Sequence, residues 1–347
     1  MTTNKYLLKI KPLGNFFFGN ERKFNADGKV NYLVKSNQYP QQTTLLGMLR
    51  FMMLQQDEAL AGEHGFKENH DEAYGNIECI SPVFLMKNEA VLLEAGFNHQ
   101  EKNEILLDSV AGKTNDANDI YHKDFIPNLK QFDLKKTLEN VYLDWITKAP
   151  FHLENEKIFT EAAQIGIKKN YKGNTDDEAF FKQTFYRMNK AYSFGLFIET
   201  KESLKDISKS FKQTLGADQS LFRIDITKQE ELSCFEQINV QNEQIKGDAK
   251  VVLLSDALVK TDVRSVCEFS FIETGDFRYI STNLKDTKRF YNISEQKGDA
   301  KKSERYTLIK RGSVLFTKDV SKLKEVLSIP AFQRIGYNYF QIYSTSK

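Results

Sequence analysis

The sequence predicts an α+β fold with two sheets. The first observation is order: a strand pattern, a helical pattern and further strands occur in the first half of the chain, and the same theme then recurs. The second is length, because 347 residues at about 150 per domain suggest roughly two domains. The third is composition, since 40% hydrophobic and 28% charged residues are ordinary for a protein with a sizeable core.

Periodicity predicts the elements of the first 100 residues. Residues 5–11 alternate in polarity, which predicts a half-buried strand. Thr43-Thr44 predicts the N-cap of an amphipathic helix of about three turns. The apolar face of that helix is Leu45, Leu46, Met48, Leu49, Met52 and Met53. A strand broken by Pro82 is expected over Ile77–Met86.

The middle of the chain mixes polar insertions with regular elements. Residues 96–135 read as a polar, irregular insertion, and the spacing of Leu138, Val141, Tyr142 and Trp145 predicts a helical face. Strands are expected over Ala162–Ile167 and Tyr192–Glu199, joined by a basic segment with Gly173-Asn174 at its tip. A polar helix is predicted over Lys201–Leu215.

Short strand patterns dominate the C-terminal part. One helix is predicted there, over Val320–Leu327. The predicted strands are Leu221–Thr227, Val251–Ser255, Val266–Ile272, Ser313–Thr317 and Tyr337–Tyr343.

The sequence lacks the signatures of several classes of protein. No apolar run reaches the 18 residues or so that a bilayer-spanning helix needs, and no secretory signal is visible, so we expect a cytoplasmic protein without membrane contact. Glycine-loop nucleotide motifs and a serine-nucleophile elbow are missing. His64 and His70 lie six residues apart in an acidic loop, a spacing of no standard zinc site. We therefore expect no metal and no other cofactor.

The distribution of charge favours an acidic partner. The net charge is only +2, but the stretch from Lys285 to Lys347 carries fourteen Lys/Arg against six Asp/Glu, or +8. Nucleic acid is the commonest acidic partner of such a region; a solvated lysine-rich surface is the alternative. Residues 168–174 place basic side chains around one tyrosine between two strand patterns, which favours an RNA-contacting hairpin over an ordinary solvated one.

Several segments form a pattern when read in order. Residues 12–24 contain Pro-Leu, a polar pair, three phenylalanines and Arg-Lys-Phe, and residues 39–50 read Tyr-Pro-Gln-Gln-Thr-Thr-Leu-Leu-Gly-Met-Leu-Arg. Residues 164–167 read Gln-Ile-Gly-Ile, with Phe-Tyr-Arg at 185–187, and residues 310–316 read Lys-Arg-Gly-Ser-Val-Leu-Phe. In this order they resemble the RAMP superfamily of CRISPR effector proteins. Within it they are most similar to subunit three of the type III-B Cmr complex, in the Cas five group.

This resemblance implies two ferredoxin-like (RRM-like) domains with loop and hairpin insertions, over residues 1–200 and 201–347. It implies a non-catalytic subunit that holds the 5′ handle of the CRISPR RNA and contacts a large polymerase-like Cas ten-type subunit and a backbone RAMP subunit. The alternative is a RAMP endoribonuclease that processes precursor CRISPR RNA. That enzyme would need a general base, usually histidine, and none of the five histidines lies in the matched segments.

The expected RNA contacts use three kinds of group: backbone and hydroxyl donors at the helix start, exposed rings, and cations. We expect Phe17 to be exposed for base stacking, although three consecutive phenylalanines also fit a core. Gly47 would allow close approach of helix and strand, and Arg50 would reach a phosphate or form a buried salt bridge. The RNA-binding candidates are Asn15, Phe17, Gln41, Gln42, Thr43, Thr44, Gly47, Arg50, Lys168, Lys169, Tyr171, Lys172, Arg187, Lys310, Arg311, Arg334 and Gly336.

Overall fold

The computed structural model confirms an α+β protein with several, mostly antiparallel, sheets and few helices. The structure describes residues 3–19, 33–69, 71–100, 103–104, 107–109, 125–127, 139–151, 158–169, 175–204, 210–216, 218–281 and 301–344. Within these residues, no helix combines the length and the apolar character needed to cross a membrane.

The largest sheet is built around the N-terminal strand β1 (Asn4–Pro12). It pairs antiparallel with β14 (Tyr192–Thr200) on one side and with β16 (Ser220–Gln229) on the other. Its remaining strands are β15 (Ser210–Leu215), β4 (Ile77–Ile80), β5 (Phe84–Lys87), β6 (Ala90–Gln100), β7 (Asn103–Glu104), β10 (Glu139–Asp144) and β11 (Pro150–Phe151). The sheet of β1 thus extends to residue 229, beyond the domain boundary predicted at residue 200.

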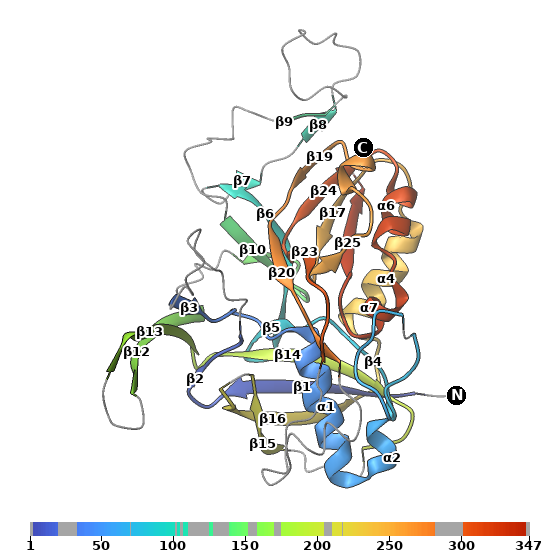
Figure 1. Ribbon diagram of the computed structural model, residues 1–347. Helices are drawn as coiled ribbons and strands as arrows, with labels where there is room; N and C mark the ends of the chain where they lie inside the picture. The colour runs from blue at the N-terminus through green and yellow to red at the C-terminus, as the bar shows by residue number, and fades with distance from the viewer. Residues whose placement is uncertain are drawn as a thin grey trace.

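Helix α1 (Gln42–Gln56) covers one face of this sheet, and the short α2 (Glu58–Ala61) follows it (Figure 1). The alternation expected in β1 is real, since Tyr6, Leu8 and Ile10 are buried together with the predicted apolar face of α1. Burial of these side chains stabilises the fold by about 25 cal/mol for each Å² of apolar surface removed from water. The same packing fixes the position of the start of α1.

A second helix, α4 (Cys234–Gln244), lies against part of the opposite face of the sheet. Ser233 and Glu236 form a reciprocal capping box at its start. Phe235 packs with Phe84, and Glu236 pairs with Lys5 of β1. The sheet is therefore buried on both sides over part of its length.

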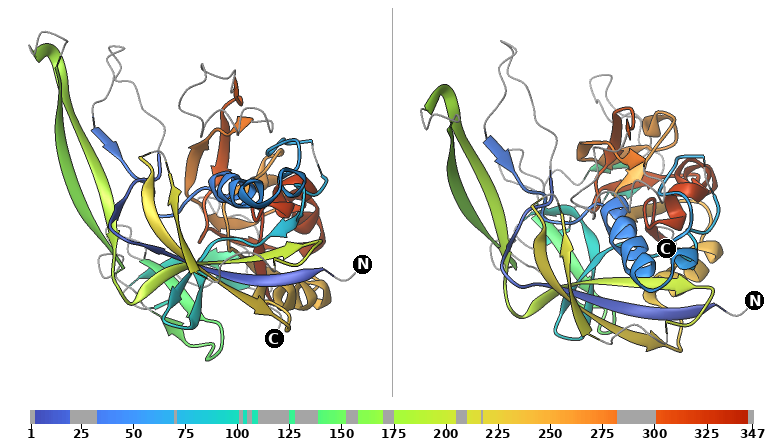
Figure 2. Two further views of the ribbon diagram at one scale, coloured as in Figure 1. Left: turned by 90° about the horizontal axis from the view of Figure 1, so that it is seen from below. Right: turned by 60° about the horizontal axis from the view of Figure 1, so that its bottom comes forward.

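Two long strands, β12 (Phe159–Lys169) and β13 (Thr175–Met188), form an arm that extends from the body (Figure 2). At its base, β13 also pairs with β2 (Asn15–Phe16) and β3 (Leu33–Lys35). Lys168 and Lys169, the first two residues of the predicted basic hairpin, end β12, and residues 170–174 lie outside the described residues.

The C-terminal sheet has the spatial order β19 (Phe269–Phe271), β24 (Val314–Thr317), β17 (Ala249–Leu253), β25 (Phe340–Ser344). Helices α6 (Val320–Leu327) and α7 (Pro330–Arg334) connect β24 to β25. A three-stranded sheet of β18 (Ala257–Leu258), β23 (Tyr306–Ile309) and β20 (Thr274–Phe277) lies beside it. The short elements are η1 (Val263–Ser265), β8 (Leu107–Ser109), β9 (Phe125–Pro127), β21 (Ile280–Ser281) and β22 (Lys301–Lys302).

Buried amide side chains hold several connections in place. Each one donates to a backbone carbonyl and accepts from a nearby backbone N–H, as a neighbouring strand would. Asn338, for example, accepts from the N–H of Leu258 at 2.9 Å and donates to its carbonyl at 2.8 Å. The amides that pair in this way are Gln42, Asn76, Asn242 and Asn338. Loss of either the donated or the accepted hydrogen bond would leave a buried polar group without its partner.

Three predicted elements are wrong. The helical face expected at residues 138–145 is strand β10, and the C-terminal end of the helix expected over Lys201–Leu215 is strand β15. Part of the insertion expected to be irregular is strand β6. In each case pairing with a distant strand overrides local pattern, since β10 pairs with β6 and β15 with β16. Helix α4 corresponds to no predicted element.

Candidate nucleic-acid interface

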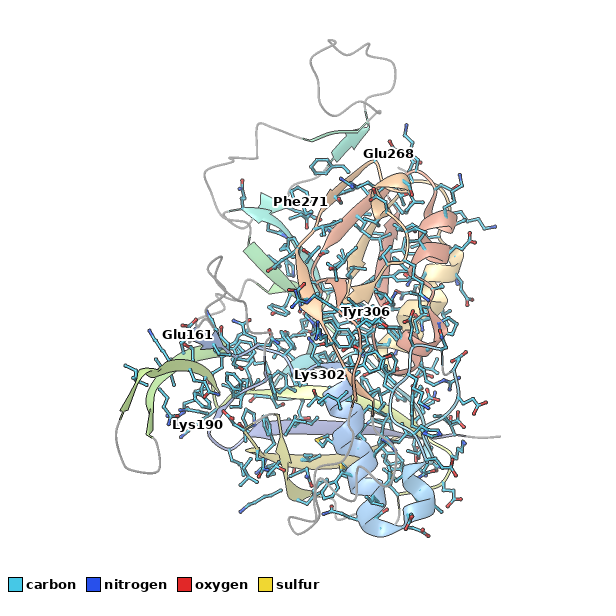
Figure 3. All side chains as sticks on the ribbon, viewed as in Figure 1. Glu161, Lys190, Glu268, Phe271, Lys302 and Tyr306 are labelled. Atoms are coloured by element: carbon cyan, nitrogen blue, oxygen red, sulfur yellow. The ribbon has the colours of Figure 1, made fainter. Side chains whose placement is uncertain are left out.

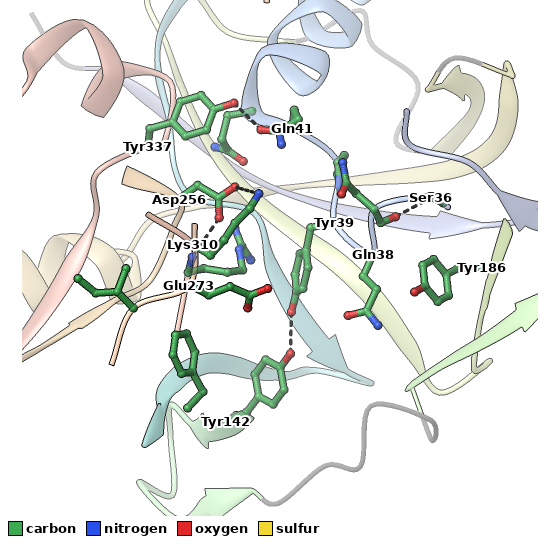
Figure 4. Close-up of a pocket in the computed structure, with 16 residues that line it drawn as sticks. Ser36, Gln38, Tyr39, Gln41, Tyr142, Tyr186, Asp256, Glu273, Lys310 and Tyr337 are labelled. Atoms are coloured by element: carbon green, nitrogen blue, oxygen red, sulfur yellow. Dashed lines mark hydrogen bonds and ion pairs between the residues drawn. The ribbon is translucent and has the colours of Figure 1, made fainter. Parts of the chain in front are cut away.

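An open groove of about 620 Å³ lies between the segment that leads into α1 and the turn that joins β23 to β24 (Figure 4). β10 and β13 add one wall, through Tyr142 and Tyr186. The lining residues are Ser36, Asn37, Gln38, Tyr39, Pro40, Gln41, Gln42, Phe97, Tyr142, Tyr186, Asp256, Ile272, Glu273, Lys310, Arg311 and Tyr337. The groove thus brings Gln41 and Gln42 together with Lys310 and Arg311, which are some 270 positions away in the sequence.

The start of α1 meets a tyrosine from the C-terminal half. Gln41 is the N-cap residue, and its side chain makes no capping bond. The Tyr337 hydroxyl donates to Oε1 of Gln41 at 2.8 Å. Burial raises the pKa of Tyr337, so this hydroxyl stays protonated. The predicted N-cap at Thr43-Thr44 is wrong: both residues are half-buried in the first turn.

Gln42 is a structural residue within this chain. Its Nε2 donates to the carbonyls of Ser81 and Ile335, each at 2.8 Å, and its Oε1 accepts from the N–H of Val83 at 3.1 Å. Since the side chain is buried and its amide is fully paired, the expected RNA contact of Gln42 is replaced by contacts that join α1 to β5 and to the C-terminal half.

Arg311 forms part of the groove wall. Its guanidinium lies 4.0 Å from the centre of the Tyr39 ring and donates to the carbonyl of Val83 at 2.8 Å. Glu94 is 3.9 Å away, and the hydroxyls of Tyr39 and Tyr142 are 3.1 Å apart. Burial lowers the pKa of Arg311, but Tyr39 and Glu94 outweigh burial and raise it above its usual value. Arg311 therefore keeps its charge inside the protein.

Lys310 offers its side chain to the groove more openly. Its Nζ donates to Oδ2 of Asp256 at 3.1 Å, while the backbone N–H of Arg311 donates to Oδ1 at 3.0 Å. Asp256 and Glu273 balance Lys310 and Arg311 among the lining residues. Such a groove favours hydrogen bonding to a polar ligand over a simple attraction of phosphate.

The base of the β12–β13 arm adjoins the groove. Tyr186 lines the groove, and the next residue, Arg187, pairs across the strands with Asn15. Both Arg187 and Asn15 are exposed. The predicted residues Lys168 and Lys169 lie at the outer end of β12, where side chains are not described, and Tyr171 and Lys172 lie outside the described residues.

Phe17, which was expected to be exposed, and Arg50 are both buried. Phe17 is only 5% exposed and packs on Phe185 with ring centres 5.5 Å apart, so the core interpretation of the three phenylalanines holds. Arg50 is buried beside the end of α2. It donates to the carbonyls of Ala61 at 3.0 Å and Gly62 at 3.1 Å, and burial lowers its pKa to about 10. It thereby satisfies orphan carbonyls at the end of α2.

The remaining predicted residues have mixed surroundings. Gly47 faces solvent on α1, and a Cβ added there would meet no atom within 4 Å, so the expected close contact with a strand is absent among the described residues. Gly336 is buried against Gln42. Arg334 pairs with Asp71 at 3.0 Å and donates to the carbonyl of Glu78 at 2.9 Å. The Arg334 side chain is therefore bound to residues of the same chain.

Sequence reasoning missed most residues of the groove, among them Tyr39, Tyr142, Asp256 and Tyr337. Tyr39 opens the motif at residues 39–50, so its position just before α1 was the available signal. Nothing in the sequence pairs Asp256 with Lys310. Within the described residues, no cluster of three His, Cys, Asp or Glu side chains could hold a metal ion.

Comparison with known proteins gives a consistent result. The family model "CRISPR-associated protein (Cas_Cmr3)" matches residues 8–344. No curated protein matches the chain. Two solved structures share its fold, described as "Cryo-EM structure of the Type III-B Cmr-beta bound to cognate target RNA" and the same with "AMPPnP, state 1". The first has 12% identity and a TM-score of 0.53, covering 96% of both chains. The second has 12% identity and a TM-score of 0.52, covering 95% of this chain and 94% of that one.

The family match spans almost the whole chain and confirms the resemblance found in its motifs. The chain belongs to the Cas_Cmr3 family of CRISPR-associated proteins.

Proposed function

We propose that this protein is a non-catalytic RNA-binding subunit of a type III-B CRISPR interference complex, in which it holds the 5′ handle of the CRISPR RNA. The match to the Cas_Cmr3 family over residues 8–344 carries this proposal. Its partners in the complex are a large polymerase-like Cas ten-type subunit and a backbone RAMP subunit.

The strand order supports two ferredoxin-like units. In the first sheet, β16, β1, β14 and β5 have the order 4-1-3-2 when numbered along the chain, and α1 joins the first two of these strands. In the C-terminal sheet, β25, β17, β24 and β19 have the same order, with α6 between the last two along the chain. A ferredoxin-like unit has the same strand order, which supports the proposal. The first unit then ends near residue 229.

The groove supports a role in binding single-stranded RNA. Its amide, hydroxyl and lysine groups suit base edges, 2′-hydroxyls and phosphates, which single-stranded RNA presents together. Gln41 and Lys310 are the predicted residues best placed to contact it. Because Tyr186 joins the groove to the β12–β13 arm, an RNA strand leaving the groove would meet Arg187, Asn15 and then the arm.

The alternative, an endoribonuclease, needs a general base near a 2′-hydroxyl. Of the two histidines in the described residues, His99 is buried beside the carbonyl of Gly96 and His64 lies next to Glu63. Neither lines the groove. This placement favours the binding role.

A reconstitution experiment separates the two functions. The chain is co-expressed with the large and backbone subunits and a CRISPR array, and in parallel with an array whose handle sequence is scrambled. We expect a particle that contains the chain and RNA with the native handle, and much less RNA with the scrambled handle. Metal-independent cleavage of repeat RNA by the purified chain, or equal recovery of both RNAs, would contradict the proposal.

A further inference from the structure

One face of the first sheet continues beyond α4 as an open surface. On β1, Lys9 and Lys11 point to the same face as Leu7, and Leu13 follows them. Antiparallel register places Arg223 opposite Lys11, and the N–H of Leu13 donates to the carbonyl of Leu221 at 2.9 Å. Cross-strand neighbours share a face, so cations and leucines form adjacent rows.

The next strand extends these rows to the sheet edge. On β15, Lys212 lies opposite Arg223 and Thr214 lies opposite Leu221. Leu13 and Leu221 are 48% and 43% exposed, and Lys212 and Arg223 are exposed too. We call Lys9, Lys11, Leu13, Lys212, Thr214, Leu221 and Arg223 the open face.

The contacts of helix α4 show which kinds of side chain cover this side of the sheet. Where it lies over β1, its Glu236 pairs with Lys5, and its Phe235 packs in one cluster with Leu7. The covered part of β1 thus has a cation under a carboxylate and a leucine under an apolar ring. The open face repeats the same pattern of cation and leucine, without a covering element among the described residues.

The open face also carries excess positive charge. Glu89 pairs with Lys9, and Asp225 pairs with Arg223 at 3.1 Å. In the part of the chain that the structure describes, no carboxylate pairs with Lys11, Lys212 or the adjacent Lys190, whose carbonyl accepts from Lys11 at 2.6 Å (Figure 3). These lysines are therefore available to the acidic groups of a partner.

We infer that the open face is a docking surface for a protein segment that carries carboxylates and aliphatic side chains, as α4 does over the neighbouring part of the same face. The two exposed leucines distinguish this partner from RNA: base stacking needs rings, and no aromatic ring is exposed among the residues of the open face. Apolar contact rimmed by charge pairs is the usual anatomy of a protein interface. The inference rests on membership in a complex, as proposed above.

The test uses the full chain in the reconstituted complex after nuclease treatment. Three variants are compared: Leu13→Ser with Leu221→Ser, Lys212→Glu alone, and a control with Leu232→Ser and Val240→Ser. The control leucine and valine are 53% and 52% exposed, which matches the test residues, but they lie elsewhere. We expect the first two variants to recover one partner protein about tenfold less and the control to match wild type. Thermal unfolding of each variant checks that it folds.

A photo-crosslinking amino acid at position 212 provides a second measurement that does not depend on removing contacts. A crosslink to a protein subunit supports the inference, whereas a crosslink to RNA overturns it. If the wild-type chain assembles and the docking variants assemble equally well, the inference alone is wrong. If the wild-type chain recovers no partner protein, the proposed function fails and the inference fails with it.

Discussion

The backbone of Gly336 packs directly against the side-chain amide of Gln42. A Cβ at position 336 would lie 1.9 Å from Nε2 of Gln42 and 2.3 Å from the carbonyl oxygen of Ser81. The residue also has a φ of +86°, which L-residues with side chains rarely adopt. Glycine is therefore required where the C-terminal half closes over the start of α1.

Replacing Gly336 by alanine should destabilise the protein by about 3 kcal/mol or more, through backbone strain and the clash with Gln42. The matched control is Gly47→Ala, which has open space within 4 Å and should stabilise α1 by roughly 0.5–1 kcal/mol. Free energies of unfolding from denaturant titration check both values. A Gly336→Ala variant as stable as wild type would show that the two halves do not meet in this way.

The Tyr337 hydroxyl should contribute about 1 kcal/mol to stability, because Tyr337→Phe leaves Oε1 of Gln41 without its donor. Tyr192→Phe is the control. Tyr192 is also buried, but its hydroxyl makes no hydrogen bond to the described residues, so it should change stability by less than about 0.5 kcal/mol. Equal effects of the two substitutions in thermal unfolding would contradict a stabilising role for the hydrogen bond between Tyr337 and Gln41.

Local pattern predicted α1, the strand break at Pro82 and helix α6, because each depends on residues close in the sequence. It failed for β10, where Val141 and Tyr142 are consecutive buried residues. A strand buried on both faces loses its alternation and resembles a helix in sequence. The capping box of α4 is visible in the sequence as Ser233 and Glu236, so this helix was predictable from local signals.

The candidate site was predictable only in part. The segments before α1 and around Lys310 were identified, and the structure joins them in one groove. Their neighbours Tyr337 and Asp256 could not be found, because the pairs Tyr337–Gln41 and Asp256–Lys310 span 296 and 54 positions. For Arg50 the residue type was evident, but its burial against backbone carbonyls depends on the tertiary fold.

The pair of Lys5 and Glu236 should give a pH-dependent contribution to stability. Burial by itself would raise the pKa of Glu236, but hydrogen bonds from Lys5 and Ser233 lower it below its usual value near 4.5. An acid with a lowered pKa stabilises the folded state above its unfolded pKa, and this contribution disappears as the pH falls through the folded pKa.

Glu236→Gln keeps the capping hydrogen bond and removes only the charge. It should lower the free energy of unfolding by about 0.5–1 kcal/mol at pH 7, and the difference from wild type should shrink as the pH falls through the lowered pKa of Glu236. Glu89→Gln removes the fully solvated partner of Lys9 and serves as the control. A deficit of Glu236→Gln that stays constant from pH 7 to pH 3 would contradict the charge-based account.

The predicted basic hairpin at residues 168–174 should contribute to RNA binding through charge. Changing Lys168, Lys169 and Lys172 to alanine should weaken binding of handle-bearing RNA to the complex and reduce the slope of log affinity against log salt by up to about three. The control changes three exposed lysines elsewhere to alanine: Lys228, Lys246 and Lys322. Binding is measured by filter retention at several salt concentrations. A wild-type slope and affinity in the arm variant would show that the arm is only a solvated hairpin.

The position of the 5′ handle tests the central claim most directly. CRISPR RNA with a single 4-thiouridine, placed either in the handle or in the middle of the guide, is assembled into the complex and irradiated. The account predicts that the handle label crosslinks to this chain, at residues around the groove, and that the guide label does not. Crosslinking of the handle label to another subunit, with none to this chain, would contradict it.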